Sequence, residues 1–97
     1  MISKKDKYRL RALANPLKPL VIIGKDGFNE SIIQAINDAI KTNELIKIST
    51  LKTYKGMPIK ELGMLIASTI DGEFIFSIGN ICVIYKKNKD INRYEVK

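Results

Sequence analysis

The sequence predicts one compact α/β domain over residues 1–97, in which three helices pack on a four-stranded mixed sheet in the order α-β-α-β-α-β-β. The first observation is the length of 97 residues, which suits a single domain. The second is a hydrophobic content of 45%, which is enough to form a core. The third is that apolar residues with helical spacing alternate along the chain with short β-branched runs.

The first helix is expected to begin at Ser3, which can cap it, and to end at Asn15, because the residue before a proline leaves the helical region. Apolar residues at spacings of three and four predict one buried stripe: Leu10, Leu13, Ala14 and Leu17. We place the polar side of this helix opposite that stripe, with Lys4, Lys7, Tyr8 and Arg11. Residues 19–23 are largely β-branched and stop at Gly24, so they predict a short buried strand.

The middle of the chain predicts two further helices with a strand between them. Asn29 is the expected cap of the second helix, which continues through the isoleucines of residues 32–40. Residues 45–51 alternate in part between apolar and polar side chains, as a strand does. Pro58 suits the first turn of a third helix over residues 59–70.

The last third of the chain predicts a hairpin and a tail. Residues 74–78 and 81–85 are apolar runs joined by Gly79-Asn80, a pair that tolerates the backbone of a tight turn. We expect a domain core over about residues 3–87 and a polar, frayed tail over residues 88–97. The side chains expected inside the core include Phe28, Phe74, Phe76 and Cys82.

Positive charge is concentrated at both ends of the chain. The formal net charge is +7, from 17 basic and 10 acidic residues. Residues 1–25 carry +6, residues 26–85 carry −2 and residues 86–97 carry +3. Polyanions are therefore the natural partners, nucleic acid first and an anionic membrane second. The bland alternative is a lysine-rich composition that says little about function.

Several function classes are disfavoured by what the sequence lacks. It has no His, the commonest general base and metal ligand, and Cys82 as its single cysteine excludes an internal disulfide. No apolar stretch approaches the ~18 residues of a spanning helix. We therefore expect a soluble, cytoplasmic protein that is not an enzyme, holds no metal or other cofactor, and binds neither a membrane nor a small-molecule substrate.

The residues Gly24-Lys25-Asp26-Gly27 form a G-x-x-G loop between the first strand and the second helix. Two glycines permit a tight turn and close backbone approach, and the opening amides of the helix can hold a phosphate. Lys25 adds a full positive charge, whereas the acidic Asp26 opposes phosphate binding unless its carboxylate caps the helix. A plain turn with no ligand is the competing interpretation.

Four segments in this order and spacing resemble the CRM domain (chloroplast RNA splicing and ribosome maturation) in its stand-alone bacterial, YhbY-like form. They are residues 10–14, residues 19–27 with the G-x-x-G loop, residues 44–48, and residues 78–80 with 83–86. The resemblance implies an RNA-binding domain whose loop acts as in KH domains, and an association with precursors of the large ribosomal subunit. Alternatives are a basic protein-interaction module and a general nucleic-acid-binding domain without a ribosomal role.

The resemblance and the charge pattern together give a candidate RNA-binding set. The resemblance implies the four loop residues and, on the first helix, Lys5, Lys7 and Arg11; the charge pattern adds Lys4 and Lys86. Tyr8 lies among the helix cations and is either a base-stacking residue or an ordinary amphipathic tyrosine. Lys47 lies in a matched segment and is expected to reach solvent.

Overall fold

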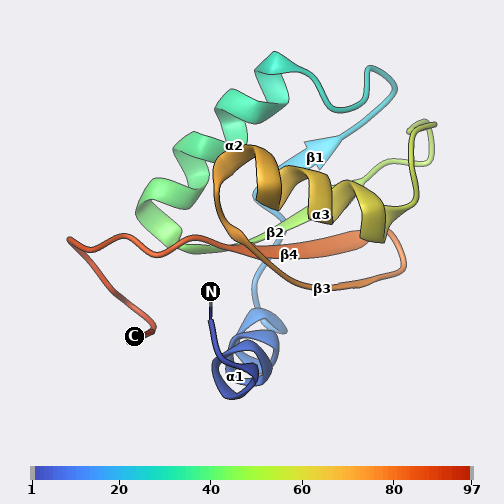
Figure 1. Ribbon diagram of the computed structural model, residues 1–97. Coiled ribbons are helices and arrows are strands. Elements are labelled where there is room, and N and C mark those ends of the chain that lie inside the picture. Colours follow the sequence, from blue (N-terminus) through green and yellow to red (C-terminus); the bar gives the residue numbers. More distant parts are fainter. Residues whose placement is uncertain (1, 97) are drawn as a thin grey trace.

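The computed structural model describes residues 2–96, and its elements follow the predicted order (Figure 1). Those elements are α1 (Lys4–Ala14), β1 (Val21–Ile23), α2 (Glu30–Asn43), β2 (Leu45–Thr50), α3 (Ile59–Ile70), β3 (Glu73–Ile78) and β4 (Ile81–Tyr85). The Ser3 side chain accepts the amide of Asp6 and the Asn29 side chain accepts that of Ile32, so both expected caps are confirmed. β1 is shorter than expected and begins at Val21.

The four strands form one mixed sheet in the order β1-β2-β4-β3. β1 pairs parallel to β2 through the α2 crossover, and the other two pairs are antiparallel. Three connections consequently meet at one end of the sheet: the G-x-x-G loop, the loop after β2 and the β3–β4 turn. Asn80 joins the last two, because its carbonyl accepts the Thr50 amide at 2.9 Å. We call this end, residues 24–27, 51–56 and 79–80, the loop end.

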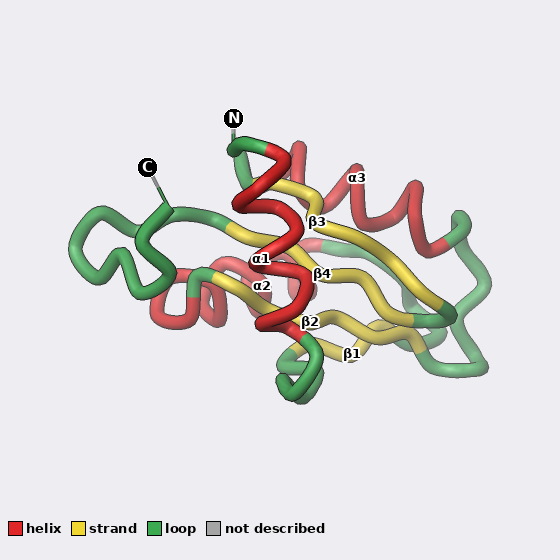
Figure 2. Tube along the Cα trace, turned by 90° about the horizontal axis from the view of Figure 1, so that it is seen from below, coloured by secondary structure: helices red, strands yellow, loops and turns green. Residues whose placement is uncertain are grey.

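Helices cover both faces of the sheet, α2 and α3 on one and α1 on the other (Figure 2). The larger core lies under α2 and α3 and includes Ile36, Ile48, Leu62, Ile66, Cys82 and Ile84. The smaller core lies under α1 and comprises Leu10, Ala14, Leu45, Ile75, Val83, Tyr85 and Val96. α1 crosses only part of its face, and it leaves Ile22 on β1 and Ile78 on β3 exposed.

The predicted faces of α1 need correction. Leu10 and Ala14 are fully buried as expected, but Leu13 is 42% exposed. A helix turns by about 100° per residue, so Lys7 and Arg11 lie beside Leu10 and Ala14 rather than opposite them. Their side chains therefore extend along the sheet, and the expectation that this side of α1 points away from the domain is wrong.

A β-bulge at Ile75 determines what β3 presents on each face. The register runs from the Phe74–Ile84 pair directly to the Phe76–Val83 pair, so Ile75 is an extra residue. Phe74 packs against the larger core, whereas Ile75 and Phe76 both pack against the smaller one. Simple alternation would have placed the two phenylalanines on the same face. Phe28 and Phe74 are partly buried against the larger core, and Cys82 is fully buried, as expected.

The residues after β4 are packed rather than frayed, because a buried carboxylate holds them. Glu44 is 0% exposed, and its two carboxylate oxygens accept the amides of Asn88 at 2.8 Å and Arg93 at 2.5 Å. Beyond these anchors, Val96 enters the smaller core and the Tyr94 ring meets that of Tyr85 edge-on. The expectation of a frayed tail is therefore wrong for residues 88–96, and residue 97 lies outside the described part of the chain.

Replacing Glu44 by Gln tests this anchor. Gln offers one acceptor in place of two and turns an amide donor toward a backbone N–H, so the variant should lose about 1.5–3 kcal/mol in the free energy of unfolding. Urea unfolding measures the loss, and hydrogen exchange should accelerate at the amides of Asn88 and Arg93. The exposed Glu30→Gln is the control and should change stability by no more than about 1 kcal/mol. Unchanged exchange at both amides would contradict the assigned role.

Candidate nucleic-acid interface

The described residues hold no cluster suited to a metal ion, and Cys82 is buried. No group of three or more His, Cys, Asp or Glu among them could hold a metal ion, and none of their helices is long and apolar enough to cross a membrane. Burial raises the pKa of the Cys82 thiol to about 12, so it stays protonated and unreactive. Burial, with the nearby Glu44 carboxylate as the second cause, raises the pKa of Tyr85 to about 12 as well.

The G-x-x-G loop is a closed turn at the loop end. The Gly27 amide donates to the Gly24 carbonyl at 3.0 Å, and Gly27 has a φ of 70°, which favours glycine. A Cβ on Gly24 would lie 3.1 Å from Leu51, so this glycine permits close packing against the loop after β2. The local backbone geometry and packing therefore account for a glycine at both positions. Lys25 and Asp26 lie exposed at the tip of the turn.

The start of α2 is less open to a phosphate than the sequence predicts. Asn29 separates the loop from the helix, and its side-chain oxygen already accepts the Ile32 amide at 3.0 Å. Glu30 adds a carboxylate to the first turn. Asp26 does not serve as the cap, so its negative charge stays at the loop tip beside Lys25. An anion at this loop would depend on Lys25 and the turn rather than on the helix terminus.

The loop end carries two further cations that nothing in the sequence pattern singles out, Lys52 and Lys55. Both are exposed in the loop after β2, which packs beside Gly24 through Leu51. Tyr54 shapes this loop, because its hydroxyl donates to the Met57 carbonyl at 2.9 Å. The ends of neighbouring parallel strands share one edge of a sheet. If the parallel pairing of β1 with β2 had been predicted, these lysines would have been predicted to lie at the same edge of the sheet as Lys25.

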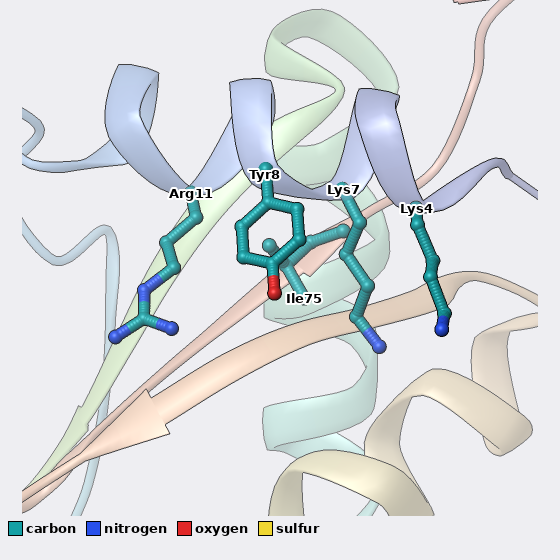
Figure 3. Close-up of a pocket in the computed structure, with 5 residues that line it drawn as sticks. All are labelled: Lys4, Lys7, Tyr8, Arg11 and Ile75. Atoms are coloured by element: carbon teal, nitrogen blue, oxygen red, sulfur yellow. The ribbon is translucent and has the colours of Figure 1, made fainter.

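Three cations project from α1 over the β3 side of the sheet. We call Lys4, Lys7 and Arg11 the basic helix face; they flank Tyr8 and, with Ile75, line a first hollow of about 290 Å³ (Figure 3). The Lys7 ammonium lies 6.0 Å from the centre of the Phe74 ring. None of the described residues that line this hollow is acidic. The uncompensated charge makes it attractive to anions.

A second hollow of about 360 Å³ continues from the first toward the loop end. The uncovered end of the sheet contributes Phe76, Ile78 and Ile81 to its lining. The Arg11 guanidinium lies 4.8 Å from the centre of the Phe76 ring, a cation–π distance. The remaining lining residues are Tyr8, Ala12, Asn15 and Lys47. Ile78 and Ile81 flank the β3–β4 turn, so this hollow borders the loop end.

Two of the predicted residues lie apart from the rest. Lys5 is exposed on α1 but lines neither hollow. Lys86 follows β4 at the opposite end of the sheet, where its ammonium donates to the carbonyl of Ile70, the last residue of α3, at 2.8 Å. This contact stabilises the end of the helix. Lys47 is half-buried rather than free in solvent, and its ammonium donates to the Asn15 carbonyl at 3.3 Å.

Comparison with known proteins gives concordant results. The sequence pattern described as the CRS1/YhbY (CRM) domain matches residues 2–86. The chain is 30% identical over 96 residues to YqeI of Bacillus subtilis, named a "probable RNA-binding protein", with 99% of each chain covered. It is 27% identical to an "RNA-binding protein" of Haemophilus influenzae, covering 92% of this chain and 89% of that one. The solution structure of SAV1595 from Staphylococcus aureus superposes with a TM-score of 0.81 at 34% identity, covering 100% of this chain and 98% of the other.

Proposed function

This chain belongs to the CRS1/YhbY (CRM) domain family, a non-enzymatic family, and on that premise we propose that it binds RNA with the basic helix face and the loop end. The observation that carries the proposal is the arrangement of Lys4, Lys7 and Arg11. The three cations line the first hollow, which has no acid among its described residues, and the second hollow shares Tyr8 and Arg11 with it and borders the β3–β4 turn of the loop end. The names of the relatives support RNA as the polyanion.

Electrostatics supports a backbone contact across the sheet. The basic helix face lies over β3, and the G-x-x-G loop follows β1, at the other edge of the sheet. Neighbouring strands lie about 4.8 Å apart, so three strand spacings separate β1 from β3 by roughly 15 Å across the sheet, and the distance along the strands adds to this. An RNA strand of several nucleotides spans that distance and brings phosphates to both regions. Such contacts position the RNA but do not read its sequence.

The RNA we propose is ribosomal RNA of the large subunit or its precursor particle. Its support is the resemblance of four segments to the stand-alone bacterial CRM proteins. Crosslinking the protein to RNA in cells, followed by sequencing of the bound fragments, tests it. Large-subunit ribosomal RNA should dominate the fragments and should be depleted for a variant with Lys4, Lys7 and Arg11 changed to Gln. Predominance of messenger or transfer RNA would contradict the ribosomal assignment but not RNA binding.

Salt dependence tests the basic helix face. With about four to six phosphates contacted, the logarithm of the binding constant should fall against the logarithm of salt concentration with a slope of roughly −3 to −5. Changing Lys4, Lys7 and Arg11 together to Gln should make the slope shallower by about 2, because three contacts are lost. Loss of the Arg11–Phe76 contact should also lower stability by about 1 kcal/mol.

The matched control for this variant changes the same number of charges elsewhere. Lys41, Lys87 and Lys89 border a separate hollow away from the loop end. Their joint replacement by Gln lowers the net charge equally, yet it should leave most of the slope intact. An equal loss of slope in the two triple variants would indicate net charge alone, and would overturn the assignment to α1.

Lys25→Glu separates a phosphate-binding loop from a plain turn. The change reverses one exposed charge and leaves both glycines and the Gly27–Gly24 hydrogen bond in place. RNA affinity should fall more than about tenfold, or ~1.4 kcal/mol, at an unchanged melting temperature. Binding and thermal unfolding are measured on the same preparation, with the exposed Lys60→Glu on α3 as the charge-matched control. Equal affinities of the two variants would make the loop a plain turn.

A further inference from the structure

We infer that the second hollow, between α1 and the uncovered end of the sheet, takes an unpaired RNA base, with Tyr8 and Arg11 as its stacking surfaces. The inference rests on the proposed function and deepens it, because it selects single-stranded or looped-out nucleotides over a regular double helix. Its basis is the shape and chemistry of the hollow rather than charge alone.

The floor of the hollow is apolar and its rim is cationic. Phe76, Ile78 and Ile81 supply the floor, and Arg11 and Lys47 supply positive charge at the side of α1. No acid is found among the described residues of its lining. A phosphate alone would gain nothing from contact with an apolar floor. A nucleotide matches both parts, because its base is flat and largely apolar on its faces while its phosphate is anionic.

Two planar side chains of α1, those of Tyr8 and Arg11, line this hollow. Tyr8 is 71% exposed and lines both the first and the second hollow, so its ring stands between them. Its neighbour one turn on, Arg11, lies against the Phe76 ring, which orders the guanidinium plane. Ordering a planar cation before it binds reduces the entropy lost when a base stacks on it. The tyrosine adds a second surface on the same side of the helix (Figure 3).

The volume and position of the hollow also favour an unpaired base. At about 360 Å³ it falls in the lower part of the range for pockets that enclose small ligands. In a double helix both faces of each base are covered by neighbours, so only an unpaired base can stack on a side chain. The chain continuing from such a base would have Lys4 and Lys7 on one side and the loop end on the other, where its phosphates meet cations.

The experiment compares Tyr8→Ala with Tyr8→Phe, using a short single-stranded RNA that carries one 2-aminopurine, the same RNA annealed to its complement, and a version with an abasic site. Wild-type protein should bind the single strand more tightly than the duplex and should quench the 2-aminopurine fluorescence. Tyr8→Ala should weaken single-strand binding at least about fivefold and reduce the quenching, with little effect on duplex binding or on the salt slope. Tyr8→Phe, which keeps the ring, should behave as wild type.

A second variant tests Arg11 at constant charge. Arg11→Lys keeps the cation and removes the plane, so single-strand affinity should fall several-fold while the salt slope stays unchanged. The abasic RNA, which keeps every phosphate, should show no difference between wild type and either Tyr8→Ala or Arg11→Lys. Thermal unfolding of each variant checks that the fold is intact.

The outcomes separate this inference from the proposed function. Equal binding of single strand, duplex and abasic RNA, with Tyr8→Ala unchanged, would overturn the stacking site and leave RNA binding by charge. If Tyr8→Phe lost as much RNA affinity as Tyr8→Ala, the hydroxyl rather than the ring would be responsible for binding, and the stacking site would also be overturned. The wild type could instead retain a protein partner that Tyr8→Ala loses, at unchanged RNA affinity. That result would show that the hollow binds the protein partner, and would overturn the stacking site. Absence of any RNA binding by the wild type would instead overturn the proposed function.

Discussion

The structure depends on covering two faces of one four-stranded sheet with only three helices. α2 and α3 together cover the first face, and the larger core fills the space beneath them. A single helix of 11 residues, α1, remains for the second face, and it buries only Leu10 and Ala14. One helix covers only a band across that face, so the residues after β4 cover one part beside it and another part stays uncovered. The second hollow is the uncovered part, and its apolar floor follows from this shortage of helix.

The packing of the chain end depends on Glu44, which lies between α2 and β2. Its backbone has a φ of 60°, an uncommon conformation for a residue with a side chain, and its carbonyl accepts the Lys86 amide at 2.8 Å. The buried carboxylate then holds two further amides of the chain beyond β4. Arg9 reinforces this from α1, because its guanidinium donates to the Tyr94 carbonyl at 2.5 Å. The smaller core is thus completed by residues far apart in the sequence, joined mainly through backbone groups.

The sequence was sufficient to predict the elements but not all of their faces. Periodicity and caps determine the order and bounds of the helices, because Ser3, Asn29 and Pro58 act locally. Periodicity also predicted the burial of Leu10. It could not place Leu13, whose exposure depends on how much of α1 the sheet can reach. The tail was mispredicted for a similar reason, since a polar segment looks frayed until Glu44, more than forty residues earlier, supplies acceptors for its amides.

Within the candidate site, the sequence was sufficient to predict which residues carry charge, but not which of them lie close together in space. The resemblance to the CRM domain led to Lys7, Arg11 and Lys25, and the surplus of cations before Gly27 added Lys4, without any structure. Lys52 and Lys55 come near that set only through the parallel pairing of β1 with β2, and Lys86 leaves it because β4 runs toward the other end of the sheet. Phe76 was expected in the core, and it lies partly buried against the smaller one, where it also lines the second hollow.

The bulge has a consequence for how this protein can change over generations. A regular strand offers one position where β3 offers two, Ile75 and Phe76, on the side facing α1. Ile75, at 3% exposed, fills the smaller core, while Phe76 lies at its border and backs Arg11. Packing and surface chemistry are therefore encoded by separate codons at this point of the sheet. Selection on binding can act on codon 76 while codon 75 keeps the smaller core filled, a separation that a strand without the extra residue would not have.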